Sequence, residues 1–86
     1  MDQEILDIIN KDFALDFRES VIKELSSLEL KHVMAESEYN LKNTRMSILY
    51  IAKGNVDEVI ELTKRAKIDF RDIIMWATQE KKSKDT

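Results

Sequence analysis

The single histidine, His32, lies three residues after Glu29, and this spacing comes closest to that of a metal site. The Glu-x-x-His pattern occurs in helical bundles in which carboxylates bridge two metal ions. Such a site needs a second copy of the pattern and two further carboxylates, so a homodimer would have to provide the other half. Glu29, His32 and Glu36 also lie beside the apolar stripe of this stretch, towards solvent. We therefore expect His32 to be a surface residue, and we predict no metal site and no cofactor.

A second group of residues with chemical potential consists of Asp69, Arg71 and Asp72. They could act as an acid, a clamp and a second acid, but both carboxylates lie at the expected start of a helix. Carboxylates in that position accept hydrogen bonds from free N–H groups and interact favourably with the helix dipole. We predict a capping role for them and expect Arg71 to pair with an acid of the preceding helix, such as Glu61. Because no Ser, His and acid set has a supporting geometry either, we predict that the protein is not an enzyme.

Positive charge in the second half of the chain indicates nucleic-acid binding as an alternative function. Residues 1–40 hold ten acids and four bases, a net charge of −6, whereas residues 41–86 hold seven acids and ten bases, a net charge of +3. Two helices joined by residues 67–69 also have the order of a helix-turn-helix. The middle of the second helix is apolar, however, where a reader of DNA bases needs polar side chains. The candidate basic patch for phosphate contacts is Lys64, Arg65, Lys67 and Arg71.

Four large apolar residues fall outside the stripes that we expect to be buried. Met75 points away from the stripe of the last helix and Trp76 lies at its edge, while Met46 and Tyr50 lie off the stripe of an earlier helix. Trp, Tyr and Met are favoured in the centres of protein interfaces. We therefore predict a small protein-binding or regulatory module, which contacts another protein or forms a homodimer through the Trp76 side. The other interpretation is that neighbouring helices cover these residues.

The composition limits the fold to one small helical domain, residues 1–86. A chain of 86 residues hides roughly 60% of the surface that its unfolded form exposes, which allows one core layer and little room for an enclosed pocket of about 300 Å³. There is no Pro and one Gly, which disfavours the tight turns of a sheet. There is also no Cys, and no apolar run approaches about 18 residues. We expect a soluble, cytoplasmic protein with no membrane partner.

Helical spacing of apolar residues begins in the first half of the chain. Ile5, Ile8 and Ile9 predict a helix over residues 2–12. Asp16, with Glu19 three residues later, predicts an N-cap and a capping box for the next helix. That helix should present Phe17, Val21, Leu25 and Leu28 on one side.

The middle of the chain has two interpretations. Several apolar or small residues keep one helical phase across a polar stretch, so residues 27–53 could form one long helix, or the chain could break near residues 39–43. We favour a helix over residues 35–53, preceded by a turn or a less regular helical segment. The residues that share the phase are Leu30, Met34, Ser37, Leu41, Ile48 and Ala52.

The clearest signals for helix ends come next. Gly54 stands where a helix turns left-handed, and Asn55 with Glu58 predicts a second capping-box start. Asp69 should cap the last helix, whose inner stripe is Phe70, Ile73, Ile74 and Ala77. We therefore predict an all-α fold, a compact array of four to five short helices at about residues 2–12, 17–27, 35–53, 56–66 and 70–82, with residues 80–86 as a frayed polar tail.

Residues 45–77 resemble a family of small, uncharacterised bacterial helical proteins. The resemblance lies in an Arg-led apolar helix (residues 45–49), an Ala-x-Gly-Asn turn (52–55), an Ala-Lys-x-Asp-aromatic-Arg-Asp segment (66–72) and Trp-Ala (76–77). It implies a helical fold and a bacterial source, and it implies no activity, because the family has none assigned. A shorter stretch, residues 54–60, is similar to a helix start in ubiquitin-associated three-helix modules, which any helix pair joined by Gly could share.

Overall fold

Helices make up nearly the whole chain. The computed structural model describes residues 1–84, and this part contains no strand, which confirms the predicted all-α fold class. None of its helices is both long and apolar enough to pass through a membrane. The elements are α1 (Gln3–Asp12), α2 (Leu15–Ser26), the short 3₁₀ turns η1 (Leu30–His32) and η2 (Met34–Glu36), α3 (Glu38–Ala52) and α4 (Val56–Lys84).

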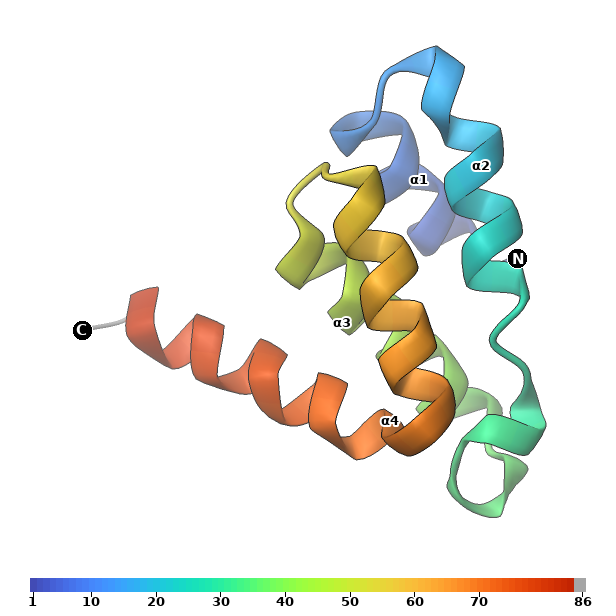
Figure 1. Cartoon of the computed structure of the whole chain (residues 1–86), viewed down its shortest axis with the longest axis vertical. Helices are drawn as coiled ribbons and strands as arrows, with labels where there is room; N and C mark the ends of the chain where they lie inside the picture. Colours follow the sequence, from blue (N-terminus) through green and yellow to red (C-terminus); the bar gives the residue numbers. More distant parts are fainter. Residues whose placement is uncertain (85–86) are drawn as a thin grey trace.

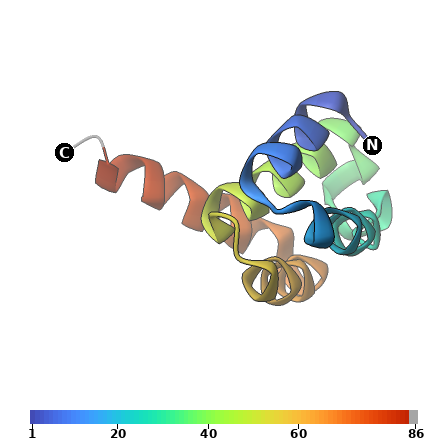
Figure 2. The same cartoon turned by 90° about the horizontal axis from the view of Figure 1, so that it is seen from above.

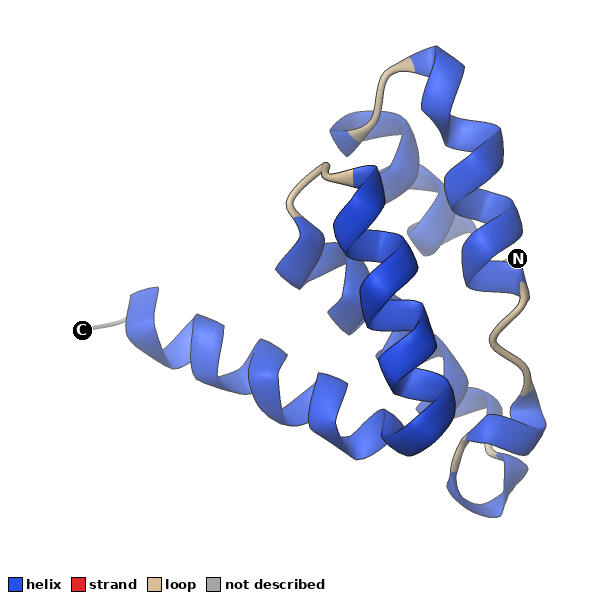
Figure 3. Ribbon diagram, viewed as in Figure 1, coloured by secondary structure: helices blue, strands red, loops and turns tan. Residues whose placement is uncertain are grey.

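The four α-helices surround one apolar core. α1 contacts α2 and α3, and α4 contacts α2 and α3, so each helix has two neighbours (Figures 1 and 3). The α3–α4 contact is the most extensive of these. Every α-helix contributes to the same cluster of buried side chains, which includes Ile9, Val21, Leu25, Ile48, Leu49, Val59 and Ile73.

The start of α2 differs from the prediction. The N-cap is Ala14, whose side chain makes no capping bond, and Asp16 lies within the first turn. Phe17 is 52% exposed, although Val21 and Leu25 on the same side are fully buried. The first turn of α2 lies at the edge of the molecule, where no other helix covers it (Figure 1). The predicted Asp16 cap and the predicted inward position of Phe17 are therefore wrong.

The connection from α2 to α3 is a less regular segment, as we favoured, and not part of one long helix over residues 27–53. Ala35 and Glu36 have positive φ angles of 58° and 48°, which interrupt any continuous helix. Ser37 then caps α3, its hydroxyl accepting a hydrogen bond from the Asn40 N–H at 3.3 Å. Because α3 begins only at Glu38, Met34 does not share its buried side and is 57% exposed.

The two helices predicted at 56–66 and 70–82 are both present, and they meet at a bend within the element α4. The bend is at Asp69, whose φ of −154° and ψ of 100° are not helical. The Asp69 side chain accepts a hydrogen bond from the Arg71 N–H at 3.1 Å, which confirms its predicted capping role. After the bend, α4 runs alongside α3 and its last turns extend beyond the other helices (Figure 2). Residues 80–84, predicted as part of a frayed tail, are helical, and residues 85–86 lie outside the described residues.

The turn between α3 and α4 is left-handed at two successive residues. Lys53 has φ 49° and Gly54 has φ 83°. A Cβ atom on Gly54 would lie 2.7 Å from the carbonyl oxygen of Asp12 at the end of α1, so only Gly fits against that backbone. Asn55 then starts α4, its Oδ1 accepting from the Glu58 N–H at 3.1 Å as predicted.

Two arginines cap the C-terminal ends of the first two helices. Arg18 donates through Nε to the carbonyl of Phe13 at 3.0 Å. Arg45 of α3 donates to the carbonyls of Leu25 at 3.1 Å and Leu28 at 2.7 Å, at the end of α2. Burial lowers the pKa of the Arg45 guanidinium from its ordinary value, and the group stays charged because that value is so high. Arg45 thus ties α3 to the end of α2.

Replacement of Arg45 by Met should lower the free energy of unfolding by about 2 kcal/mol, because two carbonyls at the end of α2 lose their donor. Urea unfolding followed by circular dichroism measures this change. Lys64→Met is the matched control, since Lys64 makes only an exposed ion pair and its loss should cost less than about 1 kcal/mol. Equal losses in the two variants would contradict the capping role of Arg45.

Replacement of Gly54 by Ala should cost about 1–3 kcal/mol of stability. The reason is twofold: φ is positive at this position, and the added Cβ meets the Asp12 carbonyl. Thermal unfolding measures the change, and an unaltered midpoint would show that the turn can move away from α1 without cost.

Candidate binding surface

An open groove runs between α1 and α3 and has a volume of about 800 Å³. Ile8 of α1 and Met46 of α3 line it, and both are partly buried against the core. Tyr39 and Tyr50, also on α3, line the groove together with Lys81 of α4. The size of the chain predicts little room for an enclosed pocket. The groove agrees with this expectation, because it is open to solvent and lies between helices on the surface.

Charged side chains form the polar part of this groove. Lys42 Nζ lies 3.4 Å from a carboxylate oxygen of Asp2 and 3.6 Å from one of Glu4. Lys53 Nζ lies 3.1 Å from Glu80 Oε2. Such exposed pairs are each worth less than about 1 kcal/mol, so they can rearrange when a partner binds. The lysines that line the groove are Lys11, Lys42, Lys53 and Lys81, and the carboxylates are Glu4 and Asp12.

The end of α4 completes the groove through Lys81. Its Nζ lies 5.1 Å from the centroid of the Tyr50 ring, within the range of a cation–π contact. Glu80 is beside it and pairs with Lys53 at the end of α3. Lys81, which the sequence places at the overlap of the last predicted helix and the frayed tail, therefore lines the groove.

The groove contains two of the four residues predicted as an interface. Met46 and Tyr50 line the groove. Trp76 is instead partly buried and packs against the core, with the Arg65 guanidinium 5.9 Å from the centroid of its ring. Met75 is 49% exposed and does not line the groove. Trp76 thus stabilises α4 against its own chain, as in the interpretation that neighbouring helices cover it.

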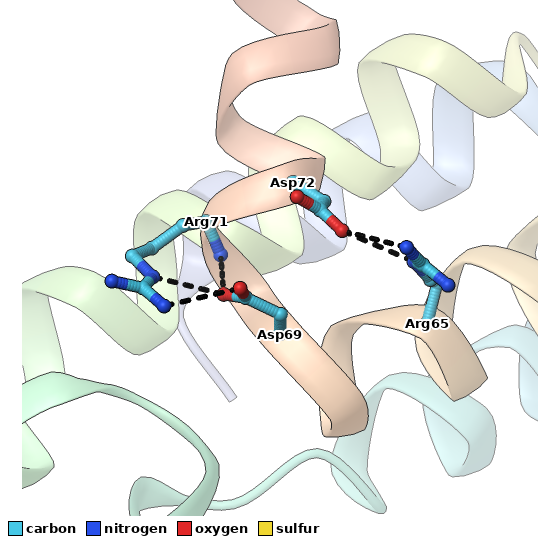
Figure 4. Close-up of polar contacts among 4 residues, drawn as sticks. All are labelled: Arg65, Asp69, Arg71 and Asp72. Atoms are coloured by element: carbon cyan, nitrogen blue, oxygen red, sulfur yellow. Dashed lines mark hydrogen bonds and ion pairs between the residues drawn. The ribbon is translucent and has the colours of Figure 1, made fainter.

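The bend of α4 holds a cluster of two ion pairs (Figure 4). Arg65, before the bend, donates through Nε and a terminal nitrogen to one oxygen of Asp72 at 3.1 and 3.0 Å. Arg71 donates to both carboxylate oxygens of Asp69, at 3.0 and 3.1 Å. The predicted pair of Arg71 with Glu61 is wrong, because Asp69 is only two residues away and reaches the guanidinium first.

Electrostatics at the bend favour the charged forms of Asp69 and Arg71. The side-chain hydrogen bond from Arg71 lowers the pKa of the Asp69 carboxyl below its ordinary value, and the Arg71 N–H adds to this shift. The same bond to Asp69 raises the pKa of Arg71. Both effects describe a capped helix start.

Most basic side chains of the predicted patch form ion pairs with carboxylates. Arg65 and Arg71 are held by the two ion pairs of the bend. Lys64 Nζ lies 3.5 Å from Glu61, and Lys67 is exposed. Three of the four cations are therefore partly neutralised by carboxylates of the same helix.

The Glu-x-x-His pattern has a capping role. The Nδ1 atom of His32 accepts a hydrogen bond from the Glu29 N–H at 2.9 Å, and the Glu29 side chain accepts one from the His32 backbone. The two residues thus cap η1 reciprocally. In residues 1–84, no three acidic, His or Cys side chains come together as a metal-binding group.

Tyr39 and Ile8 are the groove residues that our sequence interpretation missed. Tyr39 lies in a polar stretch and is 76% exposed. Its spacing to Met46 and Tyr50 is seven and eleven residues, which places all three on one side of a helix. This pattern was visible in the sequence, but the contribution of Ile8 depends on the position of α1.

No family model matches the chain, and no curated protein or solved structure is significantly similar to it. The resemblance of residues 45–77 to a family of bacterial helical proteins therefore stays a prediction.

The part of the stability that comes from the capped bend should depend on pH. Because the folded pKa of Asp69 is lowered, this contribution is complete above the unfolded value of about 4 and is lost as the pH falls through the folded pKa. An NMR titration of the Asp69 carboxyl should give a midpoint below that of an ordinary Asp. In Arg71→Gln the midpoint should move up, and an unchanged midpoint would contradict the assigned cause.

Proposed function

We propose that the chain is a protein-binding module without catalytic activity, and that it holds an α-helix of another protein in the groove between α1 and α3. The observation that carries this proposal is the row of Tyr39, Met46 and Tyr50 along α3, on the side that faces the groove. Aromatic residues and Met are enriched in the centres of protein interfaces. Their polar surroundings correspond to the rim of such an interface.

The length of the row suits a helical ligand. Residues 39 and 50 are eleven residues apart on α3, so the row extends about 16 Å at 1.5 Å per residue. About three turns of a partner helix fit along this distance. Grooves that bind amphipathic helices take anchor side chains spaced by three, four and seven residues. We therefore expect the partner to present an apolar stripe of that spacing.

Nucleic-acid binding, the alternative from the sequence, has weaker support. Three cations of the patch at Lys64, Arg65, Lys67 and Arg71 are in ion pairs, and phosphate contacts would have to displace those carboxylates.

We also propose a cytoplasmic location. It is supported by the absence of Cys, since a reducing compartment offers no use for disulfides.

Site-specific photo-crosslinking in cells tests the proposal. With p-benzoylphenylalanine in place of Tyr50, we expect a discrete adduct with another protein, which mass spectrometry identifies. The same amino acid in place of Lys64, an exposed position away from the groove, should give no such adduct. Equal adducts from both positions, or none from Tyr50, would contradict the proposal. A nuclease-sensitive adduct would favour the alternative.

Two exposed apolar residues provide a matched pair of variants for this experiment. Tyr39 and Leu15 are 76% and 75% exposed, so neither substitution by Ala should affect the fold. Tyr39→Ala should weaken binding of the captured partner about tenfold, equivalent to about 1.4 kcal/mol. Leu15→Ala should leave the affinity unchanged because Leu15 does not line the groove. Calorimetry with the identified partner measures both affinities.

A further inference from the structure

The part of α4 after the bend, residues 70–84, forms a distinct unit that we call the C-terminal arm. Phe70, Ile73 and Ala77 are buried on one side of it, and Trp76 packs partly against the core. Two polar contacts fix its far end to α3, namely Glu80 with Lys53 and Lys81 with the Tyr50 ring. The arm is thus a terminal helix with a well-formed apolar side, and its far end contacts α3.

The joint between the arm and the rest of α4 is unusually short. One residue, Asp69, leaves the helical region, and the residues on both sides of it are helical. The sequence from 56 to 84 contains no Gly and no Pro, so every residue there can adopt the helical conformation. Ile68, next to the bend, is 75% exposed, so little of its side chain is buried in the bent form.

The interactions at the bend itself are polar and close to the surface, whereas the apolar side of the arm holds it on the core. They are the Asp69 cap on the Arg71 N–H, the Asp69–Arg71 pair and the Arg65–Asp72 pair. Exposed ion pairs of this kind are weak individually. A straight α4 would replace the cap by continuous helix hydrogen bonds. The bent and straight forms therefore differ mainly in the surface on which the arm packs.

We infer that the arm exchanges between two copies of this chain. When α4 straightens at Asp69, the arm leaves its own α3 and packs on α3 of the second copy, while the second arm returns the contact. The apolar side of the arm remains buried in the dimer, because the same residues meet the same surface. A second copy is the occupant that fits, since its arm carries the same apolar side that this core already buries. Exchange of an identical terminal element is a low-cost route to a dimer, and short joints favour it.

The exchange goes beyond the proposed binding of a helix. In an exchanged dimer, each groove would be lined by Tyr50 of one copy and Lys81 of the other, so the groove would persist. Trp76 would anchor the arm in both forms. The predicted homodimer would then be held together by the exchanged arm, and not by contact between exposed Trp76 surfaces.

A pair of introduced cysteines distinguishes the two forms, because the natural chain contains no Cys. The ends of the Lys53 and Glu80 side chains meet at 3.1 Å, so Lys53→Cys with Glu80→Cys should become covalently linked by a short bismaleimide where the arm packs on α3. In the monomer this crosslink lies within one chain, and in an exchanged dimer it links two chains. After refolding at high concentration and reaction with the bismaleimide, denaturing electrophoresis measures the fraction of linked dimer. Each single-cysteine variant gives the background from random collision.

Asp69→Ala in the same double-cysteine background should shift the balance towards the dimer. Loss of a helix cap favours the straight form about fivefold in each chain, and therefore the association constant of the dimer about 25-fold. Asp57→Ala is the matched control, because Asp57 lies in the first turn of α4, away from the bend. Asp57→Ala should give the same dimer fraction as the double-cysteine chain without a further substitution.

The inference is overturned if the Asp69→Ala chain, helical by circular dichroism, forms only crosslinks within one chain at all concentrations. A dimer by light scattering whose crosslinks all lie within one chain would also overturn it, because association would then occur without exchange. If Asp69→Ala fails to fold, the double-cysteine chain that keeps Asp69 tests the inference instead. It is refolded at millimolar concentration, and its linked dimers are measured in the same way. Linked dimers above background support exchange there, and their absence contradicts it.

Discussion

The packing of α3 against α4 is the contact on which the other features depend. Ile48 and Leu49 of α3 are fully buried, and the small Ala52 and Ser47 beside them let neighbouring helices approach closely. α3 also contacts α1, so it is covered on more than one side. Only its remaining side faces solvent, and that side carries the tyrosines of the groove.

The same contact explains why the C-terminal half of α4 is well placed. An isolated terminal helix with exposed polar residues would gain little from helix propensity alone. Here Ile73 and Ala77 insert against the core, and Lys53 holds Glu80 at the far end. The bend at Asp69 allows one helix to cover two neighbours, α2 before it and α3 along its length.

Side chains rather than turn residues terminate most helices in this chain. With no Pro and one Gly, the helix ends rely on Arg18, Arg45, Ser37 and Asn55 for hydrogen bonds. This local chemistry can be recognised where the partner is close in sequence, as at Asn55. It cannot be recognised for Arg45, whose partners lie 17 and 20 residues away.

The sequence by itself determined the helical class, most helix positions and the caps at Asn55 and Asp69, because these follow from apolar periodicity and from hydrogen bonds two or three residues long. Tertiary structure decided which side chains remain exposed. Phe17 follows the periodicity of its helix and is still half exposed, whereas Trp76, at the edge of its stripe, is partly buried. Burial depends on which helix lies opposite, and that is set by the packing of segments distant in the chain. The groove likewise needs α1 beside α3, a contact that no local pattern specifies.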